Sequence, residues 1–266
     1  MRNKTLICAG LALATSSAFA GISVIGYSVQ SNGDDHLYEI NFGTGVATDL
    51  GLVGFEDAEG MTMGPGGTLY AAGGTVQDLW NITTPPGSLI GAMGTLSGLD
   101  SGMDMHGNGT LYLVSAQVGS TELYTVNPGT GAATSIGTGA YFADNLAISG
   151  AGVAYAADFA FDNELYTIDL ATGAQTLVGA LGVSPIAQAG TDFGSDGILY
   201  ALLSTGDWYT VNTATGAATL GGTIRSAAGA PLANWEGLAM NPVPEPGTFI
   251  VIVAGIGLLA ARRRRK

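Results

Sequence analysis

A short pattern recurs along the chain at a nearly constant interval, and this interval limits the folds that the chain can adopt. Each copy starts with Leu or Trp, continues with an aromatic residue and alternates apolar with polar residues, and the copies are 42 to 44 residues apart. A turn that contains glycine, usually Thr-Gly, follows each copy, and a second strand-like segment follows the turn. This arrangement is typical of a β-hairpin. The copies begin at Leu37, Leu79, Leu123, Leu165 and Trp208.

A second hairpin pattern lies between the copies of the first. It pairs residues 60–63 with 68–71, 102–105 with 111–114, 145–148 with 153–156, and 190–193 with 198–201. Each period therefore holds four strands. A four-stranded unit that repeats at about 40–50 residues is the signature of a β-propeller blade.

The two ends of the repeat region complete one further unit. Residues 22–27 match the second strand of a unit, and residues 237–240 match a first strand. We therefore expect an all-β domain over residues 21–241, a five-bladed propeller of four-stranded blades whose ring closes by pairing of the terminal strands. The Leu-Tyr-x-(Val/Ile)-(Asn/Asp) pattern followed by Thr-Gly resembles the propeller repeats of secreted bacterial proteins. That resemblance implies a fold and no specific function.

The N-terminal segment has the features of a secretory signal peptide. A basic start at residues 1–4 precedes a short apolar run, and Ala18-Phe19-Ala20 supplies small residues at the positions that a signal peptidase reads. The apolar run is too short to span a bilayer. We therefore expect residues 1–20 to be removed by signal peptidase during export.

The C-terminal segment, residues 242–266, has three parts in order: a Pro-Glu-Pro motif, an apolar run and a basic cluster. The apolar run predicts a transmembrane helix, and the basic cluster should remain cytoplasmic. The order of the parts resembles the PEP-CTERM sorting signal of Gram-negative bacteria. The resemblance implies anchoring in the inner membrane, processing by an exosortase-type enzyme, and delivery to the cell surface or to a biofilm polysaccharide matrix. An unprocessed membrane anchor is the alternative. The motif residues are Pro244, Glu245, Pro246, Arg262, Arg263, Arg264 and Arg265.

The charge balance excludes one class of partner and favours another. The chain has 21 acidic and 8 basic residues, a formal net charge of −13. Between the two terminal segments, Arg225 is the only basic residue. Such a domain repels phosphate backbones, so nucleic-acid binding is excluded, whereas cations are attracted. The same region contains no cysteine, so neither disulfides nor thiolate metal sites form there.

Most of the carboxylates fall in the loops that link one hairpin to the next. These loops share one face of a propeller, and first strands line its channel, so carboxylates next to first strands should surround the channel mouth. Asp104 and Asp192, two residues into first strands, should point into the channel. Clustered carboxylates suit calcium, which is the one cofactor that the pattern favours, and a solvated acidic face without metal is the alternative. The candidate ligands are Asp57, Glu59, Asp100, Asp144 and Glu236.

Aromatic residues near the same mouth suggest a surface for a polysaccharide or a surface protein, although such residues often fill gaps between blades. These residues are Phe55, Tyr141, Phe142 and Trp235. The two histidines, His36 and His106, should lie on opposite faces, and no nucleophile or metalloprotease motif is present. We therefore expect a non-enzymatic binding or structural module. The alternative is a calcium-dependent hydrolase or lactonase-like enzyme that uses the carboxylates at the mouth.

Overall fold

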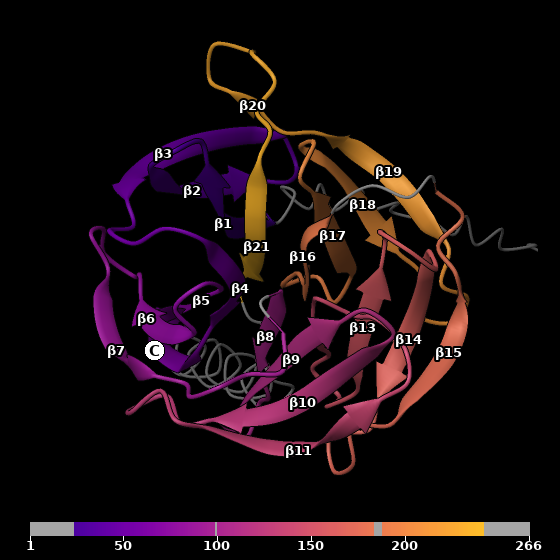
Figure 1. Cartoon of the computed structure of the whole chain (residues 1–266). Helices are drawn as coiled ribbons and strands as arrows, with labels where there is room; N and C mark the ends of the chain where they lie inside the picture. Colours follow the sequence, from indigo (N-terminus) through magenta and orange to yellow (C-terminus); the bar gives the residue numbers. More distant parts are fainter. Residues whose placement is uncertain (1–23, 99, 184–187, 242–266) are drawn as a thin grey trace, which may run out of the picture.

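The chain folds into five sheets arranged around a central axis, as a β-propeller (Figure 1). The computed structural model describes residues 24–98, 100–183 and 188–241. The prediction of a five-bladed all-β propeller is confirmed. The predicted signal peptide, the sorting motif and the predicted C-terminal helix lie outside the described residues. Within the described ranges, no helix has the length and apolar character needed to span a membrane.

The strands follow the order predicted from the repeats, and the blades are numbered here from the one that joins the two ends. Blade 1 contains β21 (Trp235–Met240), β1 (Ile25–Ser31), β2 (Asp35–Asn41), β3 (Val46–Leu52) and β20 (Arg225–Ser226). Blade 2 contains β4 (Ala58–Met63), β5 (Leu69–Gly73), β6 (Asp78–Asn81) and β7 (Ser88–Ala92). Blade 3 contains β8 (Ser101–Met105), β9 (Leu111–Gln117), β10 (Ser120–Val126) and β11 (Ala133–Gly139). Blade 4 contains β12 (Ala147–Ile148), β13 (Ala154–Asp158), β14 (Glu164–Ile168) and β15 (Gln175–Ala180). Blade 5 contains β16 (Gln188–Phe193), β17 (Leu199–Leu203), β18 (Asp207–Val211) and β19 (Ala218–Thr223).

The ring closes where the two ends of the described chain meet. β21 pairs antiparallel with β1, with Gly26 opposite Met240 and Val29 opposite Glu236. The Asn241 amide also donates a hydrogen bond to the Ile25 carbonyl, 3.1 Å away. The first strand of blade 1 therefore comes from the end of the chain and the other three from its beginning, as the repeats predicted.

Blade 1 departs from the predicted four strands. β20 adds a fifth, because it pairs in parallel with β3 through Arg225 opposite Val46. It belongs to the loop between β19 and β21, which projects at the top of the view in Figure 1. This short strand covers part of the outer edge of β3, and such cover reduces unwanted pairing at an exposed sheet edge.

A side-chain cap explains why the third and fourth strands of a blade are joined by the recurrent Thr-Gly turn. In blade 3, the Asn127 side chain accepts a hydrogen bond from the Gly129 amide at 2.9 Å. The backbone carbonyl of Asn127 accepts one from the Gly131 amide at 2.8 Å. Gly131 has a φ of 80°, which glycine adopts at little cost. The same cap recurs at Asn41, Asp169 and Asn212.

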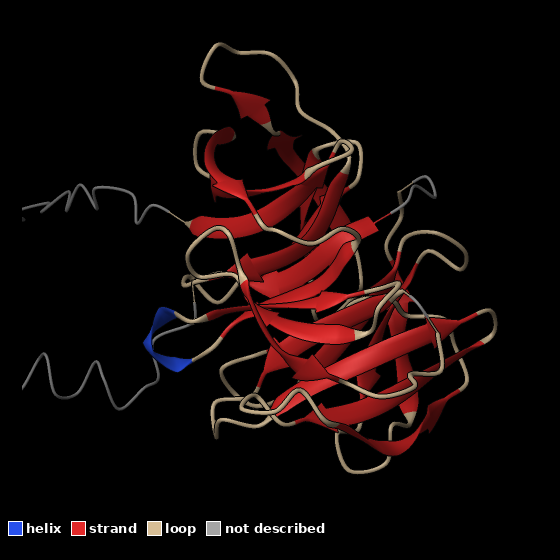
Figure 2. Cartoon of the chain, turned by 60° about the vertical axis from the view of Figure 1, so that its left-hand side comes forward, coloured by secondary structure: helices blue, strands red, loops and turns tan. Residues whose placement is uncertain are grey.

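The hydrophobic core is divided among the five junctions between neighbouring blades. Each of five buried clusters combines residues from two adjacent blades, for example Leu79 of β6 with Leu111 of β9. Strand β17 is buried along its whole length because blades 4 and 1 cover its two faces. The short helix η1 (Pro65–Gly67) lies in the turn between β4 and β5, on the face that carries the turns within hairpins (Figure 2).

Candidate functional site at the channel mouth

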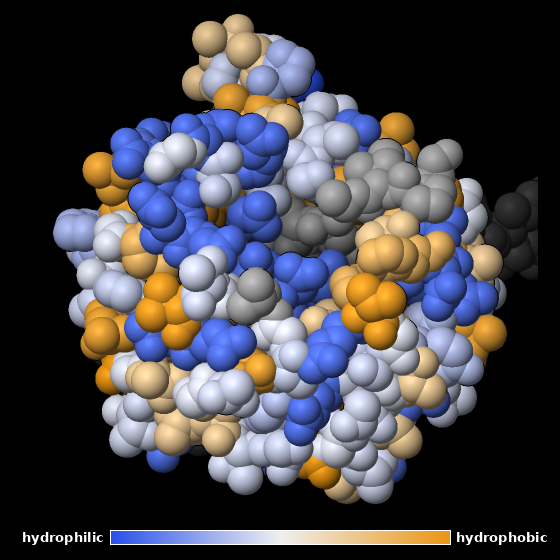
Figure 3. All heavy atoms as spheres, in the orientation of Figure 1, coloured by the Kyte–Doolittle hydropathy of each residue, from blue (hydrophilic) through white to orange (hydrophobic). Residues whose placement is uncertain are grey.

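The first strands of the five blades, β21, β4, β8, β12 and β16, stand around the axis and bring acidic residues to one end of the channel. Glu59 lies in β4 and Glu236 in β21, while Asp57, Asp100 and Asp144 lie in the loops just before first strands. Hydrophilic residues gather around the centre of this face and over blade 1 (Figure 3). We call this end the mouth and define it by the five predicted ligands, Asp57, Glu59, Asp100, Asp144 and Glu236.

The five carboxylates act on one another, which is the clearest sign that the fold brings them together. Burial raises the pKa of Glu59 to about 9, and the charges of the other four carboxylates add to this effect. Burial also raises the pKa of Asp144 to about 7, with Asp100 contributing, although a hydrogen bond from Asn145 opposes the shift. The pKa of Glu236 rises to about 7 through burial and then through the charge of Asp57. Loss of protons at this site is therefore unfavourable in the folded chain.

Hydrogen bonds position some members of the mouth and leave others without support. Asp57 accepts from the Thr75 amide at 2.6 Å and from the Thr75 hydroxyl. Beside the mouth, Asp35 accepts from the Ala58 amide at 3.2 Å, which fixes the start of β4. Among the described residues, no hydrogen bond reaches the carboxylate of Glu59 or Glu236. These two side chains carry the repulsion without compensation.

No ready metal site is formed in this conformation. In the described part of the chain, no group of three or more His, Cys, Asp or Glu side chains is arranged to hold a metal ion. Carboxylate oxygens are the ligands that calcium takes, so the donor type at the mouth fits this ion. Calcium binding at the mouth therefore stays a prediction.

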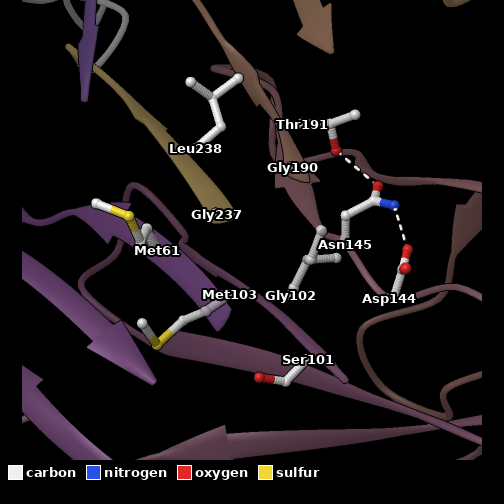
Figure 4. A pocket seen from close by; sticks show the side chains of 12 residues that line it. Met61, Ser101, Gly102, Met103, Asp144, Asn145, Gly190, Thr191, Gly237 and Leu238 are labelled. Carbon is white, nitrogen blue, oxygen red and sulfur yellow. Dashed lines mark hydrogen bonds between the residues drawn. The ribbon is translucent and has the colours of Figure 1, made fainter. Parts of the chain in front are cut away.

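The channel below the mouth is filled. A small cavity of about 10 Å³ lies there, and residues from all five blades line it. This volume has room for about one water molecule. Figure 4 shows Asn145 at one side of the cavity, where its side chain accepts a hydrogen bond from Thr191 at 2.7 Å and donates one to Asp144 at 2.9 Å.

Close contact between first strands explains why the cavity is so small. Gly60, Gly102, Gly190 and Gly237 occupy the same position in their blades and form a ring that we call the neck. A methyl group on Gly102 would overlap the Asn145 Cα, so only glycine permits this approach. The neck blocks passage of any small molecule through the described structure.

Asp104 and Asp192 lie below the neck inside the channel, as predicted, and both are buried. Asp104 accepts hydrogen bonds from the Thr62 hydroxyl at 2.8 Å, from its neighbour Met105 at 2.6 Å and from the Ile148 amide of blade 4 at 2.5 Å. Burial raises its pKa to about 6. The two carboxylates thus accept hydrogen bonds from backbone amides on the inner edges of the first strands. They do not face the mouth.

Asp192 makes the equivalent hydrogen bonds in blade 5, to its own strand and to the next blade. It accepts from the Phe193 amide and from the Met240 amide of blade 1, both at 2.6 Å. Burial, with the charge of Asp104 in second place, raises its pKa well above the usual value. Together the two side chains satisfy four N–H groups that point to the axis, where a buried unpaired donor would be costly.

The four predicted aromatic residues do not form one exposed surface. Trp235 is fully buried and its indole donates to the Leu232 carbonyl at 3.1 Å, and Phe142 is 7% exposed. The prediction that these two offer a binding surface is wrong, because both fill space within the core. Phe55 stacks on Trp80 with ring centroids 4.5 Å apart. Tyr141 is 39% exposed and stacks on Tyr166 at 4.6 Å, so it is the member with the most accessible ring.

Sequence reasoning missed the residue that occupies the fifth position of the neck. Asn145 stands where the other four blades have glycine, and its side chain exchanges hydrogen bonds with the backbone of Ala157. This substitution leaves β12 with only two paired residues. Comparison of the repeats position by position would have found it, because a polar residue replaces glycine in a single copy.

Comparisons with known proteins identify the C-terminal segment and the fold. Residues 242–266 match the PEP-CTERM protein-sorting motif. No curated protein sequence matches the chain. The chain therefore carries a PEP-CTERM motif, which indicates export and processing by an exosortase-type enzyme.

Solved structures with a similar fold have little sequence identity. A chain from a nidogen/laminin complex is 10% identical, with a TM-score of 0.53 over 82% of this chain and 98% of that one. A candidate gluconolactonase is 12% identical, with a TM-score of 0.50 over 84% of this chain and 90% of that one. A gluconolactonase from Xanthomonas campestris is also 12% identical, with a TM-score of 0.49 over 84% and 87%. At these identities, the matches with TM-scores of 0.53 and 0.50 show the fold alone.

Proposed function

We propose that the chain is an exported, non-enzymatic propeller that acts at the cell surface or in an extracellular polysaccharide matrix as a cation-dependent binding module. The PEP-CTERM motif supports export. The mouth is the proposed contact surface, because it carries five mutually repelling carboxylates, and Tyr141 offers an exposed ring in the loop that precedes Asp144. A bound calcium ion would offset the repulsion and could bridge the mouth to an oxygen-rich partner such as a polysaccharide.

The size of the cavity below the mouth supports binding over catalysis. Small-molecule sites usually enclose about 300–1,000 Å³, whereas the space beneath these carboxylates is about 10 Å³. A glycoside or lactone hydrolase also needs an acid and a base with separate roles. No described lysine or arginine lies at the mouth to make the pKa values of two carboxylates differ, since Arg225 lines a different part of the ring. Among the described residues, the cavity beneath the mouth is therefore too small to enclose a substrate, whereas the mouth can contact a partner from outside.

The proposal is tested by calcium binding and matrix association of the full chain. We expect calorimetry to detect calcium binding and the melting temperature to rise with calcium and fall with a chelator. The double variant Glu59→Gln/Glu236→Gln should lose both responses and co-sediment less with isolated extracellular polysaccharide. Glu56→Gln, an exposed neighbour in the same loop, is the matched control and should retain them.

Two results would contradict the proposal. A melting temperature unchanged by calcium and by chelator would remove the metal from it. Turnover of a lactone such as glucono-δ-lactone by the wild-type chain, lost in Glu59→Gln, would replace it with the hydrolase alternative.

The sorting route has its own test. Mass spectrometry of the protein recovered from the cell surface should find residues 1–20 and part of residues 242–266 removed. Recovery of an intact C-terminus with Lys266 would contradict exosortase processing.

A further inference from the structure

The fifth blade departs from the repeat at two facing positions. In four blades the third strand has, within its first four residues, a leucine that is at most 1% exposed, whereas blade 5 has Trp208 at the equivalent position. In the fourth strand, the residue at the bulge is Leu50, Ile90, Ile136 or Val178 in those four blades, whereas in blade 5 it is Gly221. A large ring has thus replaced leucine, and glycine has replaced the large apolar residue next to it.

The two changes belong together sterically. A methyl group on Gly221 would overlap the six-membered ring of Trp208, so the indole fills the space that a side chain at residue 221 would take. The indole is only half-buried, and its N–H is enclosed without a hydrogen-bond partner among the described residues. Leucine serves the other four blades without this cost, so stability of the blade does not explain the tryptophan.

The replacement of leucine by Trp208 and of an apolar residue by Gly221 changes the packing between blades 5 and 1. At three other junctions, the Thr-Gly turn of one blade packs directly against the fourth-strand glycine of the blade before it, as Thr130 does against Gly91. At the junction of blades 5 and 1 this contact is replaced. A methyl group on Gly45 would lie 3.0 Å from the Thr223 carbonyl, and the nearest atoms to Gly222 belong to Trp208.

A cleft of about 450 Å³ occupies this junction. Its aromatic wall consists of Phe42, Tyr200 and Trp208, with the Phe42 and Trp208 centroids 5.4 Å apart in an edge-to-face arrangement. Residues 43–45 and 221–223 also line the cleft, and the latter lie directly beside Trp208. Arg225, the only lysine or arginine among the described residues, stands at the edge and donates to the Thr44 carbonyl at 2.6 Å.

We infer that this cleft is a binding site for a neutral saccharide, separate from the mouth. Its volume falls within the range of small-molecule sites. A pyranose ring has an apolar face that packs on an aromatic ring and a rim of hydroxyls that need donors and acceptors. The cleft supplies the ring of Trp208 and the remaining guanidinium donors of Arg225. The hydroxyls of Thr44 and Thr223 donate to Asn41 and Asp207, and each keeps a lone pair that can accept a hydrogen bond from a ligand.

Charge favours a neutral ligand over an acidic one. The chain carries a net charge of −13, and the one cation in the cleft already bonds to a backbone carbonyl. An anion would meet long-range repulsion with little compensation. A purely apolar ligand would cover the free guanidinium donors of Arg225 without giving them an acceptor, which is unfavourable.

Calorimetry of the full chain against maltose, cellobiose and lactose tests the inference. The protein should be held in a detergent without a sugar headgroup, because a glycosidic headgroup would compete. We expect saturable binding of at least one disaccharide, with a Kd on the order of 1 mM or below. The variant Trp208→Leu/Gly221→Ile restores the residues of the other blades and should close the cleft. It should weaken binding at least tenfold, while its melting temperature stays equal or rises.

Two single variants test which residues contact the disaccharide. Arg225→Gln, at an exposed position, should weaken binding about threefold or more even if the double variant does not fold. Tyr141→Ala, which removes the exposed ring assigned to the proposed function, should leave disaccharide binding unchanged and so separates the two sites. Absence of saturable binding by the wild type would overturn the inference, including the case in which another segment of the chain fills the cleft. Equal binding by wild type and Arg225→Gln, or loss of binding in Tyr141→Ala, would overturn it as well.

Discussion

Asp104 illustrates how one buried side chain can join three consecutive blades. Its carboxylate accepts from Met105 in its own strand and from Ile148 in the next blade, while Thr62 of the preceding blade donates to it as well. First strands have no neighbour on their inner edge, so their N–H groups need another acceptor. Two other blades have alanine at the equivalent position, Ala147 and Ala239, so the channel can accommodate a smaller side chain there.

We predict that Asp104→Ala lowers the free energy of unfolding at pH 7 by about 2 kcal/mol, because it leaves two buried N–H groups without an acceptor. Urea denaturation followed by circular dichroism measures the change. Asp100→Ala, an exposed residue at the mouth, is the control and should change stability by less than about 0.5 kcal/mol. Equal stability of Asp104→Ala and wild type would show that water replaces the carboxylate.

The sequence predicted some individual residues well and others poorly. Asp104 and Asp192 were placed in the channel correctly, because their position within the repeat defines the direction of the side chain. Trp235 was misplaced, since the sequence does not show whether an aromatic residue beside the mouth turns outward or into the junction. Asn145 and Trp208 were overlooked for a related reason. Their importance lies in the difference from the equivalent residues of other blades, and the shared pattern conceals it.

At the scale of elements, the neck depends on the approach of neighbouring first strands. Gly60 and Gly102 face each other across adjacent blades, and a methyl group on Gly60 would lie 2.8 Å from the Met103 nitrogen. These contacts are between backbones and cannot be relieved by side-chain rotation. The neck therefore sets the radius of the whole ring.

We predict that Gly102→Ala lowers the free energy of unfolding by about 3 kcal/mol or more, because β8 and β12 must move apart. Gly73→Ala in β5 is a matched control. A methyl group there would lie 3.7 Å from its nearest neighbour, the Asp78 carbonyl, so stability should change by less than about 1 kcal/mol. Thermal melting of the two variants compares them directly. Equal melting temperatures would contradict the role of the neck.

The repeat period determined most of the elements in advance. Alternation and turn glycines placed the four strands of each blade, and the unmatched ends of the repeat region predicted the pairing of β21 with β1. Two details could not be predicted. β20 is two residues long, and its pairing with β3 depends on which blades become neighbours when the ring closes. β12 is short because Asn145 pairs through its side chain, which no backbone pattern records.

At the scale of the whole molecule, closure of the ring places the sorting motif next to a structural strand. β21 ends at Met240, and the motif begins at residue 242. Processing within the motif leaves the blade complete, whereas a cut before Trp235 would remove the first strand of blade 1. The propeller and its export signal are therefore adjacent but separable, which is what an exported domain requires.

The stability of the whole ring should depend on pH. Burial raises the pKa of Glu59 to about 9, of Asp144 and Glu236 to about 7, and of Asp104 to about 6, whereas their usual values are 4.5 or below. Between about pH 4 and pH 9 the folded chain therefore binds more protons than the unfolded chain. Stability falls as pH rises under this condition. Without divalent cations, we expect the free energy of unfolding to be at least about 2 kcal/mol lower at pH 8 than at pH 5, since one pKa unit corresponds to about 1.4 kcal/mol.

Urea denaturation at a series of pH values measures this slope, and variants locate its origin. Glu59→Gln removes the carboxylate with the largest rise in pKa among the mouth residues, so it should stabilise the protein at pH 8 and flatten the slope. Glu56→Gln, exposed in the same loop, should leave the slope as it is in the wild type. Calcium should raise stability at pH 8 more than at pH 5, because protons and cations compete for the same oxygens. A stability that increases from pH 5 to pH 8 in the absence of cations would show that the mouth carboxylates are already compensated in the folded protein.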